Sequence, residues 1–227
     1  MLWVKICGMT SPDDAVAASD AGADAVGMLF APSKRRIGIE QGKQIVQALP
    51  KTMEKVGVFY DETASTIEYI AAEVGLTAIQ LHGDESPEFA KNLFRNNPRR
   101  SRAQMRVFKT LHIRKGVEGL ARDFLRDKCV DGLLLDSIVH DPSTGEILRG
   151  GTGQTFDWKR TYDFLPGIER ETRVIVAGGL SPVNVAEAIR VMQPWGVDVC
   201  SGVECEPGKK DTNKIRDFVA AARAAKN

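Results

Sequence analysis

Strand-like and helix-like segments alternate along the whole of this 227-residue chain. The strand-like runs are apolar and rich in β-branched residues, and they are Leu2–Ile6, Ala25–Phe30, Lys55–Phe59, Ala78–Leu81, Met105–Thr110, Gly132–Leu135, Arg173–Ala177 and Val197–Cys200. The stretches of helical period are Pro12–Ala21, Glu40–Leu49, Ala64–Val74, Pro87–Phe94, Gly116–Arg126, Phe156–Phe164, Pro182–Met192 and Asn213–Ala224. Eight parallel strands with crossover helices can close into a ring without edge strands. The pattern therefore predicts a (β/α)8 TIM barrel, an α/β fold formed by a single domain over residues 1–227.

The alternative architecture is a doubly wound open sheet, which binds dinucleotides through a Gly-rich loop after its first strand. Here Gly8 stands alone after the first strand-like run, without a GxGxxG motif. The Gly-rich loops instead follow the sixth, seventh and eighth runs, where a barrel commonly binds phosphate. The late position of these loops favours the barrel.

Three helix starts combine a serine with a proline, at Ser11-Pro12, Ser86-Pro87 and Ser181-Pro182. A serine hydroxyl can cap the first helical turn, and proline at the first helical position loses no hydrogen bond because its N–H is missing. We expect each serine to cap its helix.

The charge balance excludes two classes of partner. There are 31 Lys and Arg residues against 30 Asp and Glu residues, so the formal charge is only +1. No global field attracts nucleic acid or a membrane surface. The local basic run Arg95–Arg106 contains Asn96, Asn97 and Pro98, and we interpret it as a solvated loop. No apolar stretch approaches the length of a membrane span, so we predict neither partner.

The sulfur and imidazole residues do not indicate a metal site. Four cysteines form no CxxC pair, and three histidines lie scattered without ligand spacing. The chain begins in a strand-like run rather than in a signal-type segment. We expect a protein of the reducing cytoplasm.

Two strand-like runs end in an ionisable residue, which indicates proton-transfer chemistry. Cys7 follows Leu2–Ile6, and Asp136 follows Gly132–Leu135. In barrels of this kind, chemistry takes place at the carboxyl ends of the strands, so a thiol and a carboxyl group there are a candidate base and acid. Each also has a structural interpretation, since a free cysteine is often a small buried hydrophobe and an aspartate can cap a loop.

Three late loops predict a phosphate site. They contain Gly150-Gly151-Thr152-Gly153, Gly178-Gly179 and Ser201-Gly202. Glycines let the backbone approach a ligand, and a following helix start offers free N–H groups. Tight turns alone also demand glycine, but three such loops in succession favour a small phosphorylated molecule as the ligand.

Three further predictions concern side chains near the mouth of the barrel. Lys5 and Asp198 share the inward parity of neighbouring strands, so we expect an interior ion pair between them. Arg35 carries a planar fork that suits a carboxylate, although it is also consistent with an ordinary surface arginine. His82 ends the fourth run and either lines the site or forms a structural hydrogen bond.

Several motifs in order across the chain closely resemble the phosphoribosylanthranilate isomerase family of tryptophan biosynthesis. These motifs are KICGMT at Lys5–Thr10, the SKRRI loop at Ser33–Ile37, VGVF at Val56–Phe59, QLHGDE at Gln80–Glu85, LLLDS at Leu133–Ser137, GGTGQTFDW at Gly150–Trp158, AGGLSPVNV at Ala177–Val185 and DVCSGVE at Asp198–Glu204. The resemblance departs from the family at Cys200, where the family commonly has serine. The segment Ile138–Leu148 also looks longer than usual, and we expect it to be a lid or a hairpin-like excursion.

The resemblance implies a cofactor-free Amadori rearrangement of N-(5-phosphoribosyl)anthranilate to 1-(2-carboxyphenylamino)-1-deoxyribulose 5-phosphate. It implies that Asp136 protonates the furanose ring oxygen and that Cys7 then removes the proton from C2. It also implies that Arg35 binds the anthranilate carboxylate. The phosphate would be bound by backbone N–H groups of Gly151, Gly153, Gly179, Ser201 and Gly202. The resulting prediction is an isomerase that interconverts an aldose and a ketose.

Two alternatives stay open at the level of sequence. One is a barrel that binds a phosphorylated ligand without turning it over. The other is a sugar-phosphate isomerase or epimerase of different substrate range, although dual-substrate relatives have aspartates where this chain has Cys7 and Thr110. The sequence is also compatible with either a monomer or a homodimer.

Overall fold

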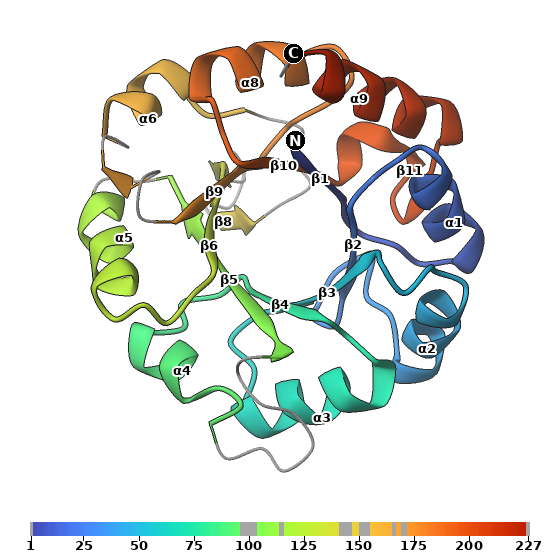
Figure 1. Cartoon of the computed structure of the whole chain (residues 1–227), viewed down its shortest axis with the longest axis horizontal. Coiled ribbons are helices and arrows are strands. Elements are labelled where there is room, and N and C mark those ends of the chain that lie inside the picture. The colour runs from blue at the N-terminus through green and yellow to red at the C-terminus, as the bar shows by residue number, and fades with distance from the viewer. Residues whose placement is uncertain are drawn as a thin grey trace.

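The computed structural model of the chain is a closed ring of parallel strands surrounded by helices (Figure 1). It describes residues 2–95, 104–113, 116–140, 147–149, 155–164, 167–168 and 172–225. The strands of the ring are β1 (Trp3–Ile6), β2 (Ala25–Leu29), β3 (Glu54–Phe59), β4 (Ala78–Leu81), β5 (Arg106–His112), β6 (Gly132–Asp136), β9 (Arg173–Val176) and β10 (Gly196–Val199). Their order around the ring is β1-β10-β9-β6-β5-β4-β3-β2. The predicted TIM barrel is confirmed, and the open-sheet alternative is wrong.

The helices of the outer layer follow the strands in sequence, as predicted. They are α1 (Pro12–Asp20), α2 (Ile39–Gln47), α3 (Ala64–Val74), α4 (Pro87–Asn92), α5 (Val117–Arg126), α6 (Trp158–Phe164), α8 (Val185–Met192) and α9 (Thr212–Ala225). Most predicted boundaries agree with the structure to within a few residues. The fifth strand continues to His112 rather than ending at Thr110. Cys200 lies just beyond β10 instead of inside it.

The predicted serine caps are confirmed at two helices and wrong at the third. The Ser11 hydroxyl accepts a hydrogen bond from the Asp14 N–H, and the Ser86 hydroxyl accepts one from the Phe89 N–H. Ser181 instead uses its own N–H to donate to the Asn184 side-chain oxygen at 2.8 Å. Helix α8 therefore starts at Val185 and not at Pro182, because the asparagine closes a local turn in front of it.

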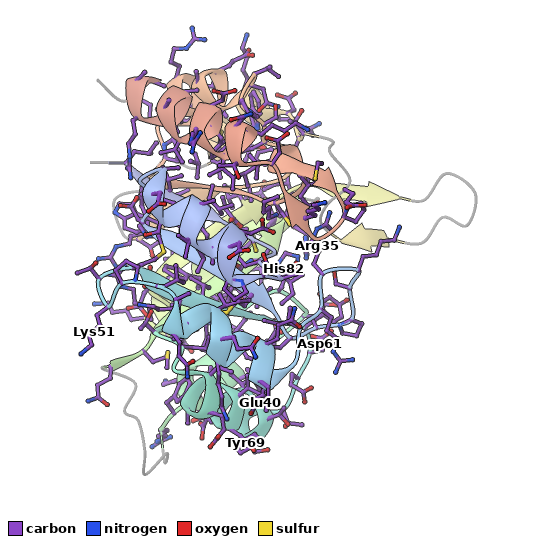
Figure 2. All side chains as sticks on the ribbon, turned by 90° about the vertical axis from the view of Figure 1, so that its right-hand side faces the viewer. Arg35, Glu40, Lys51, Asp61, Tyr69 and His82 are labelled. Atoms are coloured by element: carbon purple, nitrogen blue, oxygen red, sulfur yellow. The ribbon has the colours of Figure 1, made fainter. Side chains whose placement is uncertain are left out.

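Two small antiparallel hairpins extend the barrel at loops. Strand β7 (Ile138–His140) pairs with β8 (Ile147–Arg149), which agrees with the hairpin interpretation of Ile138–Leu148. Figure 2 shows this hairpin projecting from the end of the barrel where Arg35 and His82 lie, whereas Lys51 lies at the opposite end. A second hairpin, β11 (Glu204–Glu206) with β12 (Lys209–Lys210), follows β10 and was not predicted from the sequence.

The core has two parts, because alternate residues of each strand point inward and outward. Outward-facing residues such as Val4, Ile6 and Val107 belong to the large apolar cluster that contacts the helices. The inward-facing apolar cluster consists of Trp3, Ala25, Val56, Ala78, Phe108, Leu134, Ile175 and Ala177. Two residues closer to the carboxyl ends of β1, β4, β5 and β6, the same inward face carries the buried polar residues Lys5, Gln80, Thr110 and Asp136. The space toward the carboxyl ends is therefore left to polar side chains.

Candidate active site

An interior ion pair lies directly above the inward apolar cluster. Lys5 on β1 is opposite Asp198 on β10, and its ammonium nitrogen lies 2.9 Å from Asp198 Oδ2. The same nitrogen donates to Gln80 Oε1 at 2.9 Å. Burial opposes the charge on Lys5, but Asp198 and Cys7 outweigh it and raise the pKa of Lys5. The predicted ion pair is confirmed, and Gln80 is a partner that sequence analysis missed.

Asp198 is ionised less readily than an ordinary aspartate. Burial is the largest effect and, despite the neighbouring Lys5 ammonium, raises the pKa of Asp198 to about 7. Its Oδ1 atom is buried without a hydrogen-bond partner among the described residues. The carboxylate therefore keeps one free acceptor beside the cavity.

Two thiols lie side by side at the carboxyl ends of β1 and β10. The parallel register pairs Ile6 with Val199, so Cys7 and Cys200 are the next facing pair, and their side chains are hydrogen-bonded. The hydrogen bond to Cys200 and burial raise the pKa of the Cys7 thiol, whereas Lys5 lowers it. The hydrogen bond from Cys7, aided by Lys210 and Arg35, lowers the pKa of Cys200 to about 7. The pair therefore loses its first proton near neutral pH from Cys200, and the hydrogen bond between the two thiols is a path by which Cys7 can pass its proton to Cys200.

Asp136 is the last residue of β6 and is buried beside the cavity. The pKa of Asp136 is raised to about 7, mainly by burial and secondly by the negative charge of Asp198. Its Oδ2 atom lies 3.8 Å from His82 Nε2. A carboxyl group with this pKa is partly protonated at neutral pH and can act as an acid.

Gly178 allows the loop after β9 to approach Asp136. Its φ is +76°, a conformation that residues with a Cβ atom rarely adopt, and a Cβ atom here would lie 2.7 Å from Asp136 Oδ1. It would also lie 2.5 Å from the Ser137 nitrogen. A larger residue at this position would force Asp136 out of place.

His82 fulfils both roles that the sequence left open. It lines the cavity, and its Nδ1 atom lies 3.1 Å from the Thr110 hydroxyl and 3.2 Å from Gln80 Nε2. Its ring also contacts the ring of His112 edge to face, with 5.1 Å between the centroids. These contacts fix the imidazole at the rim of the site.

Arg35 reaches the cavity from the loop after β2, and it is not an ordinary surface arginine. Its Nε and Nη2 atoms donate to the two carboxylate oxygens of Glu204, at 2.7 and 2.6 Å. Glu204 begins the unpredicted β11–β12 hairpin and was missed, as was Lys210, which also bonds to it. The Pro207-Gly208 dipeptide between them is a turn signal that could have indicated the hairpin.

The late glycine loops converge only in part as predicted. Gly179 and Ser201 line the cavity, whereas the adjacent Gly202 does not, and a Cβ atom at Gly202 would collide with the Leu180 carbonyl oxygen. Gly202 thus serves the close approach of two loops. Gly151 and Gly153 lie outside the described residues.

The candidate site is a single cavity of about 360 Å³. It brings together six of the predicted catalytic and substrate-binding residues, namely Cys7, Arg35, His82, Asp136, Gly179 and Ser201. In the described part of the chain, no group of three or more His, Cys, Asp or Glu side chains is arranged to hold a metal ion. None of the helices described has the length and apolar character needed to cross a bilayer.

Comparison with known proteins agrees with this geometry. Residues 4–221 match the family model of N-(5'-phosphoribosyl)anthranilate (PRA) isomerase. The chain is 38% identical over 226 residues to N-(5'-phosphoribosyl)anthranilate isomerase of Trichlorobacter lovleyi, which covers 99% of this chain and 100% of that protein.

Solved structures give the same result. The crystal structure of phosphoribosyl anthranilate isomerase from Thermotoga maritima is similar with a TM-score of 0.80 and 37% identity, over 99% of this chain and 100% of that one. A phosphoribosyl anthranilate isomerase in complex with reduced 1-(o-carboxyphenylamino)-1-deoxyribulose 5-phosphate is similar with a TM-score of 0.79 and 35% identity, over the same shares. By sequence and by structure, the chain belongs to the N-(5'-phosphoribosyl)anthranilate isomerase family.

Proposed function

We propose that this chain isomerises N-(5-phosphoribosyl)anthranilate to 1-(2-carboxyphenylamino)-1-deoxyribulose 5-phosphate in tryptophan biosynthesis, with Asp136 as general acid and Cys7 as general base. The reaction oxidises C2 of the sugar to a ketone and reduces C1 within one molecule. Its electrons therefore balance without an external redox partner. The cytoplasm is the proposed location, because the four cysteines are free thiols and a reducing compartment preserves them.

One observation carries the assignment of the acid and the base. A carboxyl group with a pKa of about 7 and a thiol hydrogen-bonded to a second thiol face the same cavity from different strands. Strands β9 and β10 separate β6 from β1 in the ring, so the two groups approach a bound molecule from different directions. Proton donation and proton abstraction at neighbouring atoms require such an arrangement.

The acid acts first. Protonated Asp136 gives its proton to the furanose ring oxygen as the bond from that oxygen to C1 breaks. The nitrogen lone pair forms the C1=N bond of an iminium ion, and Asp136 is left as a carboxylate. Lys5 stabilises negative charge on Asp136, which limits the cost of this step in a buried site.

The base acts second. The positive iminium acidifies the C2–H bond, so a thiolate of moderate basicity is sufficient. Cys7, having passed its proton to Cys200, takes the C2 proton while the C–H electrons form the C1=C2 bond of an enolamine. The enolamine then gains a proton at C1 and loses one from the C2 hydroxyl, which gives the ketone.

Arg35 and the late loops are the proposed anchors for the two anionic ends of the substrate. The guanidinium lines the cavity and suits the anthranilate carboxylate. Backbone N–H groups of Gly179, Ser201 and Gly202 are proposed to bind the phosphate, together with those of Gly151 and Gly153.

The proposal is tested by following the loss of anthranilate fluorescence from freshly prepared substrate. We compare the parent protein with Cys7→Ser and Asp136→Asn. Because general acid and base catalysis each contribute about 10²- to 10⁴-fold, each variant should lose activity by that factor while keeping the unfolding transition of a folded protein.

Cys205→Ser is the matched control, since Cys205 is an exposed thiol outside the cavity, and it should retain parent activity. A parent protein that binds the substrate but does not accelerate its loss would contradict the isomerase and favour a non-catalytic binding protein. Full activity in either active-site variant would remove that residue from the mechanism.

A further inference from the structure

Glu204 holds the guanidinium of Arg35 by one edge. The Nε and Nη2 atoms of Arg35 each donate to a different oxygen of the same carboxylate. Such paired, charge-assisted bonds fix the plane of a guanidinium as well as its position. Two of its five N–H groups are used in this way, which leaves both N–H groups of Nη1 and the second one of Nη2 for a ligand.

Lys210 holds Glu204 from the other side. The Lys210 side chain is completely buried, and its Nζ atom donates to Glu204 Oε1 at 2.9 Å. The Gly208 N–H donates to the same oxygen at 3.3 Å. Burial opposes ionisation of Glu204, but Arg35 and Lys210 outweigh it and lower the pKa of its carboxyl group. The carboxylate therefore stays charged and fully engaged.

The group of Arg35, Glu204 and Lys210 has a net positive charge. One carboxylate lies between two cations, so the net charge at the wall of the cavity is +1. A buried, uncompensated positive charge is costly unless an anion approaches it. The group is thus suited to a ligand with one negative charge at this point.

The Lys210 ammonium also connects this group to the phosphate end of the site. It donates to the Cys200 carbonyl oxygen at 3.0 Å, and Cys200 directly precedes Ser201 and Gly202. The loop that lines the phosphate end and the arginine at the other end are therefore held by one buried lysine.

We propose that Glu204, supported by Lys210, is a positioning residue that orients Arg35 toward the substrate carboxylate and so selects substrates that carry one. This inference rests on the function proposed above. Glu204 itself has no part in proton transfer, because its two oxygens are occupied by Arg35, Lys210 and the Gly208 N–H. Its contribution is to substrate binding and specificity.

The test compares two substrates that differ at one group. N-(5-phosphoribosyl)anthranilate carries the carboxylate, and N-(5-phosphoribosyl)aniline lacks only that carboxylate. For Glu204→Gln we expect KM for the anthranilate substrate to rise about 10- to 100-fold, the size of a charge-assisted hydrogen bond, with little change in kcat. For the aniline substrate, kcat/KM should stay within about twofold of the parent value.

Glu206→Gln is the matched control, because Glu206 belongs to the same strand but is exposed and, within the described part of the chain, forms an ion pair only with the exposed Lys209, at 3.5 Å. It should leave both substrates unaffected. If Glu204→Gln does not fold, Lys210→Met tests the same point and should lower the preference for the anthranilate substrate in the same direction.

Each remaining outcome overturns a different statement. An equal loss of kcat/KM for both substrates would mean that Glu204 only maintains the structure, and the inference would fail while the proposed function stood. A parent protein that turns over neither substrate would refute the proposed function, and the inference with it.

Discussion

Two buried lysine–carboxylate pairs have nearly the same geometry and different surroundings. Lys5 and Asp198 meet inside the barrel at 2.9 Å, whereas Lys109 and Glu85 meet outside the ring of strands at 2.8 Å. All four side chains are almost completely buried. The difference lies in what else each carboxylate contacts.

Glu85 has every oxygen occupied. Its Oε1 atom accepts hydrogen bonds from the Asp61 and Gly83 N–H groups, and Lys109 takes Oε2. The pair thus fastens the loops after β3 and β4 to strand β5, away from the cavity. Asp198 keeps one oxygen free beside the cavity and raises the pKa of Asp136. A fully satisfied pair stabilises the fold, and an incompletely satisfied one adjusts the chemistry of its neighbours.

The largest effect on stability is expected for Lys109→Met. This change leaves the Glu85 carboxylate buried without its cation, and removing one partner of a buried pair costs about 3–5 kcal/mol of unfolding free energy. Urea unfolding measures this loss. The turnover number of the folded protein should stay within about twofold of the parent value, because the pair does not line the cavity.

Lys209→Met provides the contrast, since its pair with Glu206 is exposed and we expect a change of about 0.5 kcal/mol or less. A Lys109→Met protein that kept its stability but lost its turnover would reverse the distinction between the two buried pairs.

The second-largest effect is expected for Asp198→Asn, in the pH dependence of its activity. The proposed general acid, Asp136, must be protonated, so we expect activity to fall as pH rises through its pKa, which is about 7 in the parent. Removing the Asp198 charge takes away a repulsion that raises this pKa, and it also leaves the Lys5 charge less compensated. Both changes lower the pKa, so the alkaline limb of the kcat profile should move down by about one pH unit.

Asp217→Asn, an exposed change on α9, should leave this limb in place. An unmoved alkaline limb in Asp198→Asn would show that the group titrating there is not Asp136 or that Asp198 does not act on it.

The sequence predicted the barrel and most of the cavity because both follow from local pattern. Alternation of inward and outward residues fixed the parity of Lys5 and Asp198, and closure of the ring made their strands neighbours. Cys7 and Asp136 were recognisable because each ends an apolar strand, and parallel strands bring their carboxyl ends to one face of the barrel.

The contacts of Glu204 and Glu85 were not predictable in the same way. Glu204 belongs to a hairpin after the last strand, yet it bonds to Arg35 in a loop 169 residues earlier. Glu85 contacts Lys109, which points outward toward the helices rather than into the barrel. Local periodicity reports which face a residue occupies, but not which distant loop folds back onto it. The cap of α8 failed for a related reason, because Asn184 competes with Ser181 for the same turn.

The smallest effect is expected for Cys200→Ser, which introduces the residue that the family resemblance predicts at this position. The proposed base, Cys7, must be deprotonated, so we expect activity to fall as pH decreases through the ionisation of the thiol pair. In the parent, this first ionisation belongs to Cys200, whose pKa is about 7, and in the proposed mechanism Cys7 then passes its proton to Cys200. A serine hydroxyl can still donate a hydrogen bond to Cys7, but it does not ionise in this range.

Cys7 must then lose its own proton against burial, so the acid limb should move to higher pH by less than about one unit, with kcat at pH 8 within about threefold of the parent. Rate profiles between pH 5 and 9 for both proteins measure this shift, and superimposable acid limbs would mean that Cys7 ionises independently of its neighbour.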